Sequence, residues 1–128
     1  MRLLLDTHAL IWILRGDRRV PAAVRSLVDD ANHAIYVSSI SVYELWIKTQ
    51  RGLIDIGMTP DQFARQMQEA LQLRPLVVTW EHALEAAQLP RHHLDPFDRI
   101  LVAQANKERL SIVSADTSLK KYVANVIW

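Results

Sequence analysis

Five residues near the start of the chain, Leu3-Leu4-Leu5-Asp6-Thr7, decide the fold class. Here a short apolar run ends in an aspartate and passes directly into a segment of helical character. Similar apolar runs recur at 35–37, 76–78, 112–113 and 126–127, and longer helical segments separate them. Such alternation is typical of strands whose sheet is covered by helices on both faces. The sequence therefore predicts a three-layer α/β fold around a central, mainly parallel sheet of five strands.

Proline and glycine residues place the helices between these runs. Gly16 and Gly52 follow helical segments, and proline suits the first turn of a helix. We expect helices at six places: over 7–15, 21–30, 41–51 and 81–88, from Pro60, and from Pro96 to about Arg109. Because no linker, low-complexity tract or repeat divides the chain, residues 1–128 are expected to form one domain.

The composition limits the kinds of protein that this chain can be. Half of the 128 residues are hydrophobic, so a sizeable core forms without disulfides or structural metals. The absence of cysteine excludes thiolate metal sites and cysteine nucleophiles, and it suits a reducing cytoplasm. The longest apolar run, at 9–14, is too short to span a membrane. We expect a soluble cytoplasmic protein, and its net charge of +1 neither demands nor forbids a nucleic-acid partner.

Four of the fourteen acidic residues stand out by their position. Asp6 and Asp116 follow apolar runs, and Glu44 and Asp98 are expected in the first turns of helices. Each also has a structural explanation, because an aspartate at a strand end commonly caps the next helix. The segment Ser41-Val42-Tyr43-Glu44 has the pattern of a capping box. In Asp95-Pro96-Phe97-Asp98, a cap precedes a first-turn proline and an acid that complements the helix dipole.

The expected topology gives these acids a shared role. All strand-to-helix junctions of an open parallel sheet lie at its carboxyl edge, where ligands of such folds bind. Four carboxylates in one crevice repel each other unless a cation offsets their charge. Oxygen ligands suit Mg²⁺ or Mn²⁺, and these ions support phosphodiester hydrolysis by activating water and neutralising charge. We expect Asp6 and Asp98 as principal metal ligands, with Glu44 and Asp116 completing the catalytic site directly or through water.

Four segments of the chain resemble the PIN-domain family, and within it the VapC ribonuclease toxins of type II toxin–antitoxin pairs. They lie at 3–8, 39–45, 93–105 and 112–116, and Asp95-Pro96-Phe97-Asp98-Arg99 in the third is the most specific. The resemblance places the acidic site of the family on the four residues already singled out. It further implies dependence on Mg²⁺ or Mn²⁺, endonucleolytic cleavage of RNA, dimerisation, and neutralisation by a cognate VapB-like antitoxin.

Residues near the acids have candidate supporting roles. Four can hydrogen-bond the carboxylates or a bound water, although such residues at helix starts usually act as caps: Thr7, Ser41, Asp95 and Ser114. Four basic side chains are candidate contacts to RNA, although charges near helix ends are usually only solvated: Lys48, Arg51, His93 and Arg99.

Other function classes predict different features. A non-catalytic PIN-like module that binds RNA or a protein has no need of the acids, so their presence counts against it. An aspartyl-phosphate enzyme with Asp6 as nucleophile usually has a second aspartate where this chain has His8, and the chain lacks a Gly-rich phosphate loop. The helix after Asp6 is apolar on nearly every face from Ala9 to Leu14, which fits either a protein partner or a fully internal helix.

Overall fold

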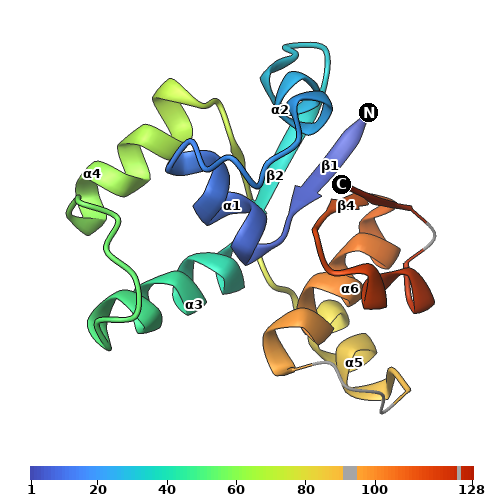
Figure 1. Cartoon of the computed structure of the whole chain (residues 1–128). Helices are drawn as coiled ribbons and strands as arrows, with labels where there is room; N and C mark the ends of the chain where they lie inside the picture. Colours follow the sequence, from blue (N-terminus) through green and yellow to red (C-terminus); the bar gives the residue numbers. More distant parts are fainter. Residues whose placement is uncertain (91–94, 124) are drawn as a thin grey trace.

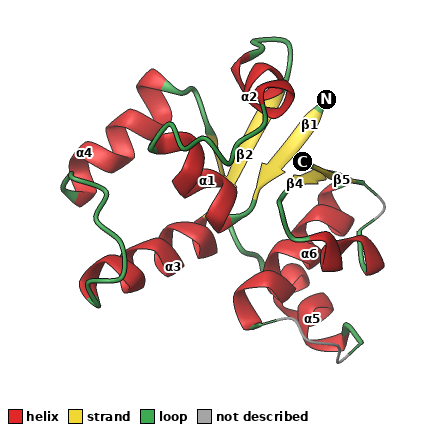
Figure 2. Cartoon of the chain, viewed as in Figure 1, coloured by secondary structure: helices red, strands yellow, loops and turns green. Residues whose placement is uncertain are grey.

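The computed structural model of the chain describes residues 1–90, 95–123 and 125–128. A five-stranded sheet forms its middle layer (Figure 1, Figure 2). The strands are β1 (Arg2–Leu5), β2 (Ala34–Ser38), β3 (Arg74–Leu76), β4 (Ser111–Val113) and β5 (Val126–Ile127). They lie in the order β3-β2-β1-β4-β5, and every pair is parallel. The predicted α/β fold and its five-stranded sheet are confirmed.

Helices cover both faces of this sheet. They are α1 (Thr7–Leu14), α2 (Ala22–Asp29), α3 (Ser39–Gln50), α4 (Pro60–Arg65), α5 (Trp80–Gln88) and α6 (Pro96–Glu108). A π-helical turn, η1 (Gln66–Ala70), continues α4, and a 3₁₀ turn, η2 (Thr117–Lys121), lies between β4 and β5. None of the helices in the described ranges has both the length and the apolar character to cross a membrane.

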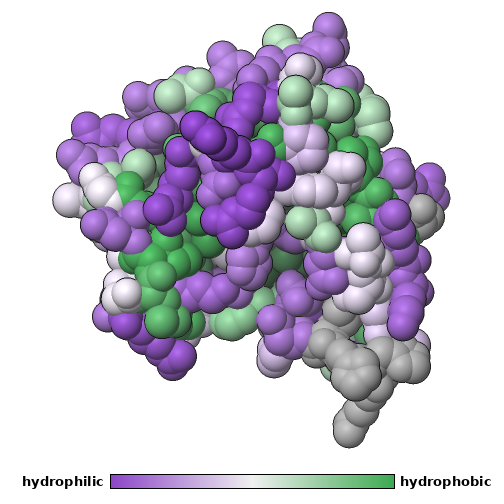
Figure 3. Space-filling model, in the orientation of Figure 1, coloured by the Kyte–Doolittle hydropathy of each residue, from purple (hydrophilic) through white to green (hydrophobic). Residues whose placement is uncertain are grey.

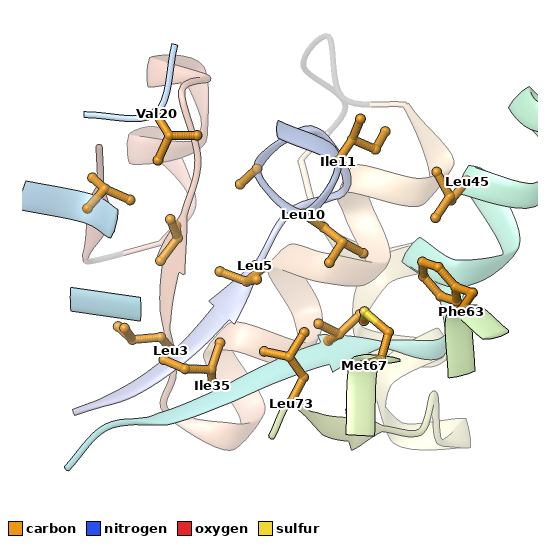
Figure 4. Close-up of a cluster of buried hydrophobic side chains, with 14 residues drawn as sticks. Leu3, Leu5, Leu10, Ile11, Val20, Ile35, Leu45, Phe63, Met67 and Leu73 are labelled. Atoms are coloured by element: carbon orange, nitrogen blue, oxygen red, sulfur yellow. The ribbon is translucent and has the colours of Figure 1, made fainter. Parts of the chain in front are cut away.

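Alternate residues of β1 supply the two halves of the core. Leu3 and Leu5 face a cluster of buried side chains from α1 to α4, including Leu10, Leu45 and Phe63 (Figure 4). Leu4 faces the opposite cluster, which α6, β4 and η2 complete. Since successive side chains of a strand point to opposite faces, an unbroken leucine run is what a central strand buried on both sides requires. Figure 1 accordingly shows α1 to α4 on one side of the sheet and α5 and α6 on the other.

The strand register brings three junctions side by side at the carboxyl edge. Leu5 is level with Val37 of β2 and with Val113 of β4. The next residues along the chain, Asp6, Ser38 and Ser114, therefore leave the sheet at neighbouring positions. Because Asp6 and Ser38 are the N-caps of α1 and α3, the edge also carries the N-terminal ends of two helices.

Two predicted boundaries are wrong for identifiable reasons. Helix α3 begins at Ser39 with Ser38 as its N-cap, so the capping box expected from Ser41 to Glu44 does not form and Glu44 lies in the second turn. Strand β3 spans 74–76 rather than 76–78. Proline within a strand argues against a central position, but β3 is an edge strand, where Pro75 is tolerated. The helix boundaries expected elsewhere differ from the structure by one residue or so.

Candidate active site

Asp6 is held at the carboxyl end of β1 by bonds to its backbone and its side chain. Its N–H donates to the carbonyl of Val113, and its Oδ1 accepts the N–H of Ala9 at 2.7 Å. The side chain of Ser114 also hydrogen-bonds this carboxylate. Only 6% of Asp6 is exposed, and burial raises its pKa above the usual value despite these bonds and the nearby His8. A buried carboxylate in a fixed orientation is suited to binding a cation.

Asp98, in the first turn of α6, shows that the predicted acids converge. Burial is the main reason why its pKa rises to about 7. The negative charges of Asp95, Glu44, Asp6 and Asp116 each raise it further. These acids come from four separate segments of the sequence, and charges act strongly on one another only within about 10 Å. The four acids that the sequence singled out thus lie near enough to one another to interact through their charges.

Glu44 is buried in α3, where it makes an ion pair. Its Oε2 lies 3.0 Å from Nζ of Lys48, one turn further along the helix, and only 6% of Glu44 is exposed. Lys48 was a candidate contact to RNA, but in this structure its ammonium group balances the buried carboxylate. The pair holds Glu44 at the site and places one positive charge beside the acids.

Asp116 lies at the exposed rim of the site as the N-cap of η2. Its Oδ1 accepts the N–H of Ser118 at 2.9 Å, and its own N–H donates to Oγ of the buried Ser114. Because Ser114 also bonds Asp6, it links two of the four acids. The supporting role expected of Ser114 therefore has a direct structural counterpart.

The residues suit a hard divalent cation, although they do not form a complete set of ligands around one position. Within 1–90, 95–123 and 125–128, no three acidic or histidine side chains are already drawn together at metal-ligand spacing. The donors are carboxylate oxygens, as Mg²⁺ and Mn²⁺ prefer. Thr7 and Ser41 also have buried hydroxyls that find no hydrogen-bond partner in the described part of the chain. Such unpartnered groups, with crowded carboxylates, suit a site that takes a cation and its waters.

The other predicted site residues have structural roles or lie further away. Asp95 is the N-cap of α6, and its Oδ1 accepts the N–H of Asp98 at 2.8 Å. The guanidinium of Arg99 donates to carbonyls at the end of α5, including that of Leu89 at 2.7 Å, and this geometry supports a structural role rather than a contact to RNA. Arg51 is exposed at the C-terminal end of α3. His93 lies outside the described residues.

His8 lies at the site, although it is not among the site residues that the sequence predicts. It is exposed in the first turn of α1 and close enough to Asp6 to lower the pKa of that carboxyl. Its ring contacts that of Trp12, with centroids 6.0 Å apart. The signal available in the sequence was its position, two residues after the first acid.

Comparison with protein families identifies this arrangement. The model of the PIN domain matches residues 3–125, nearly the whole chain. The chain belongs to the PIN domain family. The resemblance seen in the sequence motifs is thereby confirmed, and the acids of this PIN domain lie where its strands β1 and β4 and its helices α3 and α6 meet. A comparison with curated proteins gives no match.

Solved structures share the fold of this PIN domain. A chain from the crystal structure of VapBC2 from Rickettsia felis, bound to a promoter DNA fragment, has a TM-score of 0.72 at 15% identity, with 100% of this chain and 98% of that chain covered. For FitAcB from Neisseria gonorrhoeae the TM-score is 0.69 at 19% identity, covering 98% and 96%. A toxin–antitoxin complex from Klebsiella pneumoniae gives 0.66 at 21% identity, also covering 98% and 96%. At these identities the likeness establishes the fold alone.

Proposed function

We propose that this PIN domain is a metal-dependent endoribonuclease that hydrolyses RNA phosphodiester bonds and acts as a VapC-like toxin. The observation that carries the proposal is the effect of Asp6, Glu44 and Asp116 on the pKa of Asp98. Crowded carboxylates at the carboxyl edge of a parallel sheet destabilise the protein unless a cation binds there. The proposal treats residues 1–128 as one nuclease domain working in the cytoplasm.

Asp6 and Asp98 would hold Mg²⁺ or Mn²⁺, with Glu44 and Asp116 as further ligands, directly or through water. The bound ion supplies an activated water and charge neutralisation for phosphodiester hydrolysis. The assignment of Asp6 and Asp98 as principal ligands rests on their raised pKa values, whereas the carboxylate of Glu44 already forms an ion pair with Lys48. Asp116 is exposed, which favours a role through water for this acid.

The other groups of the site orient these acids and the substrate. Ala9 N–H and Ser114 fix the carboxylate of Asp6, and Lys48 fixes that of Glu44. The N-terminal ends of α1 and α6 lie at the site, and helix N-termini favour negative charge such as that of a phosphate. In the metal-free protein the pKa of Asp98 is raised to about 7, so binding of a cation near neutral pH would be coupled to loss of a proton from this acid.

The toxin role would require an antitoxin, and the structure offers a surface that suits a protein partner. A mainly apolar pocket of about 360 Å³ lies between α3, α4 and β3, with Val42, Trp46, Phe63 and Met67 in its lining. Figure 3 shows hydrophobic surface over the region where α3 and α4 face each other. One of the solved structures that share this fold is a toxin–antitoxin complex from Klebsiella pneumoniae, which supports such a partner here. We assign the pocket to the antitoxin.

Self-association is supported by a second apolar surface. Trp80 and Leu84 are one turn apart on α5 and are 87% and 63% exposed, and Val77 before them is 67% exposed. Groups of large, exposed apolar side chains on one surface rarely remain in water, and they mark protein interfaces. We propose that this surface joins two copies of the chain in a homodimer.

The test of the proposed function is RNA cleavage in Mg²⁺ or Mn²⁺ by the wild type and by the Asp6→Asn and Asp98→Asn variants. We expect cleavage by the wild type, loss of cleavage with chelator, and loss in both variants. Asp61→Asn is the matched control, because Asp61 is an exposed acid in the first turn of α4, which like α6 begins with proline. Full activity in either site variant would refute the assigned mechanism. Calorimetry that detects no Mn²⁺ binding would favour a non-catalytic RNA- or protein-binding module.

A further inference from the structure

Three aromatic side chains form a continuous cluster beside the acids. The ring centroids of His8 and Trp12 are 6.0 Å apart, and those of Trp12 and Trp128 are 5.6 Å apart, with both pairs tilted by about 60°. His8 is exposed, Trp12 is half-buried against the core, and Trp128 is 37% exposed. We call these three residues the aromatic ledge. The proposed mechanism uses none of them.

The sheet topology puts the aromatic ledge at the same edge as the acids. His8 is two residues after Asp6 and acts on its charge. Trp128 follows β5, whose Ile127 accepts the N–H of Ser114 at 3.0 Å, so it leaves the sheet next to the junction that carries Ser114. His8 at one end of the ledge is therefore near Asp6, and Trp128 at the other end is near the junction of Ser114. The ledge thus lies beside the acids at which the proposed function places a phosphate.

The charge around the aromatic ledge is positive. The guanidinium of Arg19 lies over the ring of Trp12, 4.4 Å from its centroid. Asp17 fixes this guanidinium through contacts at 3.1 and 2.9 Å, and Arg15 is close enough to lower the pKa of Asp17 as well. Across residues 15–19, three arginines stand against one aspartate. The ledge thus combines π-faces with cations, whereas the pocket between α3 and α4 is mainly apolar.

We propose that the aromatic ledge is a subsite of the ribonuclease that stacks an unpaired base of single-stranded RNA beside the scissile phosphate. Proteins recognise such RNA by stacking its bases on aromatic rings, histidine included, and on guanidinium planes. His8 and Trp128 provide the exposed rings, Trp12 supports them from the core, and the arginines attract the backbone. This inference names a substrate contact of the proposed function and rests on that function.

The test compares packing with stacking at the two exposed positions. His8→Leu and Trp128→Leu put an apolar side chain without a π-face at these positions, while His8→Phe and Trp128→Phe put an apolar side chain that has one. Binding is measured by fluorescence anisotropy with a labelled single-stranded RNA that the wild type cleaves. An Asp98→Asn background keeps the RNA intact. We expect the leucine variants to bind about 5- to 100-fold more weakly and the phenylalanine variants to bind within about threefold of the background protein. Melting temperatures of all variants should agree closely.

Abasic sugars placed singly along the RNA locate the stacked base. An abasic sugar at one position next to the cleaved bond should weaken the binding of RNA to the background protein. The same abasic sugar should not weaken binding further when the protein also carries Trp128→Leu. The inference is wrong if the leucine variants bind RNA as tightly as the phenylalanine variants do. It is also wrong if the loss of affinity caused by Trp128→Leu simply adds to the loss caused by the abasic site. Either result would leave the ribonuclease function standing. A wild type that binds and cleaves no single-stranded RNA would overturn both.

Discussion

Replacing Asp98 with asparagine should stabilise the metal-free protein at pH 8 while abolishing its cleavage of RNA. Asparagine has nearly the same shape as aspartate but carries no charge. In the wild type, the ionised Asp98 faces the charges of Asp95, Glu44, Asp6 and Asp116 in a partly buried place. The variant removes this repulsion, so one substitution should have opposite effects on stability and on function.

The size of this effect follows from the pKa of Asp98. Burial and neighbouring acids raise that pKa from 3.8 to about 7, a difference of about three units or about 4 kcal/mol if fully expressed. Asp98 is only half-buried, so solvent screens part of the repulsion and about 1–2 kcal/mol is the expected gain in unfolding free energy. An acid whose pKa is higher in the folded state destabilises that state above the folded pKa, and the cost vanishes below the unfolded pKa. The advantage of Asp98→Asn should therefore grow from about pH 4 to about pH 7 and then level off.

Urea denaturation in chelator, at pH values from 4 to 8, measures the difference. Asp61→Asn is again the control, because Asp61 lies in the first turn of α4 without neighbouring site acids, and its loss should reduce stability by about 0.3–1 kcal/mol through the helix dipole. Adding Mn²⁺ should stabilise the wild type and have little effect on Asp98→Asn. If Asp98→Asn loses stability at pH 8 as Asp61→Asn does, the acids do not crowd Asp98 and the reasoning is wrong.

Three further predictions concern the surroundings of the site. Lys48→Met leaves Glu44 buried without its partner and should lower the unfolding free energy by about 1–3 kcal/mol in urea denaturation, whereas Lys48→Arg should lose less. Arg99→Met should lower the free energy of unfolding by about 1–3 kcal/mol, measured as a lower melting temperature. Arg99→Lys should not restore this stability, because one ammonium group cannot reach carbonyls on several sides. Ala64→Arg fills the apolar pocket with a charge and should weaken co-purification of a coexpressed antitoxin at least about tenfold, whereas Gln66→Arg outside the lining should not.

The sheet was predictable because its signals are local. Short apolar runs bounded by proline, glycine and capping residues specify strands buried on both faces, whatever lies around them. The exceptions depended on tertiary structure. Pro75 belongs to a strand only because β3 lies at the sheet edge, and Val78, expected in that strand, instead donates its N–H to Oγ of Ser39. Neither fact can be read from the residues next to them.

The acids of the site were predictable as a set, but their partners were not. Position relative to strand ends singled out Asp6, Glu44, Asp98 and Asp116, and the structure brings them within reach of one another. Lys48 and Arg99 were only candidate contacts to RNA, and the partners that the structure shows for them, Glu44 and the end of α5, were not predicted. Long basic side chains have many possible partners, so sequence position alone does not select one. The contact of His8 with Trp12, by contrast, follows from helical spacing of four residues.

Capping and metal binding are not competing explanations for these acids. A carboxylate offers about four acceptor positions, and a cap uses one or two of them. Asp6 and Asp116 each accept a helix N–H through Oδ1, which fixes the group and leaves acceptor capacity for a cation. Asp98 differs, because Asp95 caps α6 and no hydrogen bond to the Asp98 carboxylate is found among the described residues. Its carboxylate gains the modest helix-dipole stabilisation of a first-turn acid, but it suffers the repulsion of the other acids. Burial and repulsion outweigh that stabilisation in the metal-free protein, so of the four acids Asp98 is the one for which a bound cation matters most.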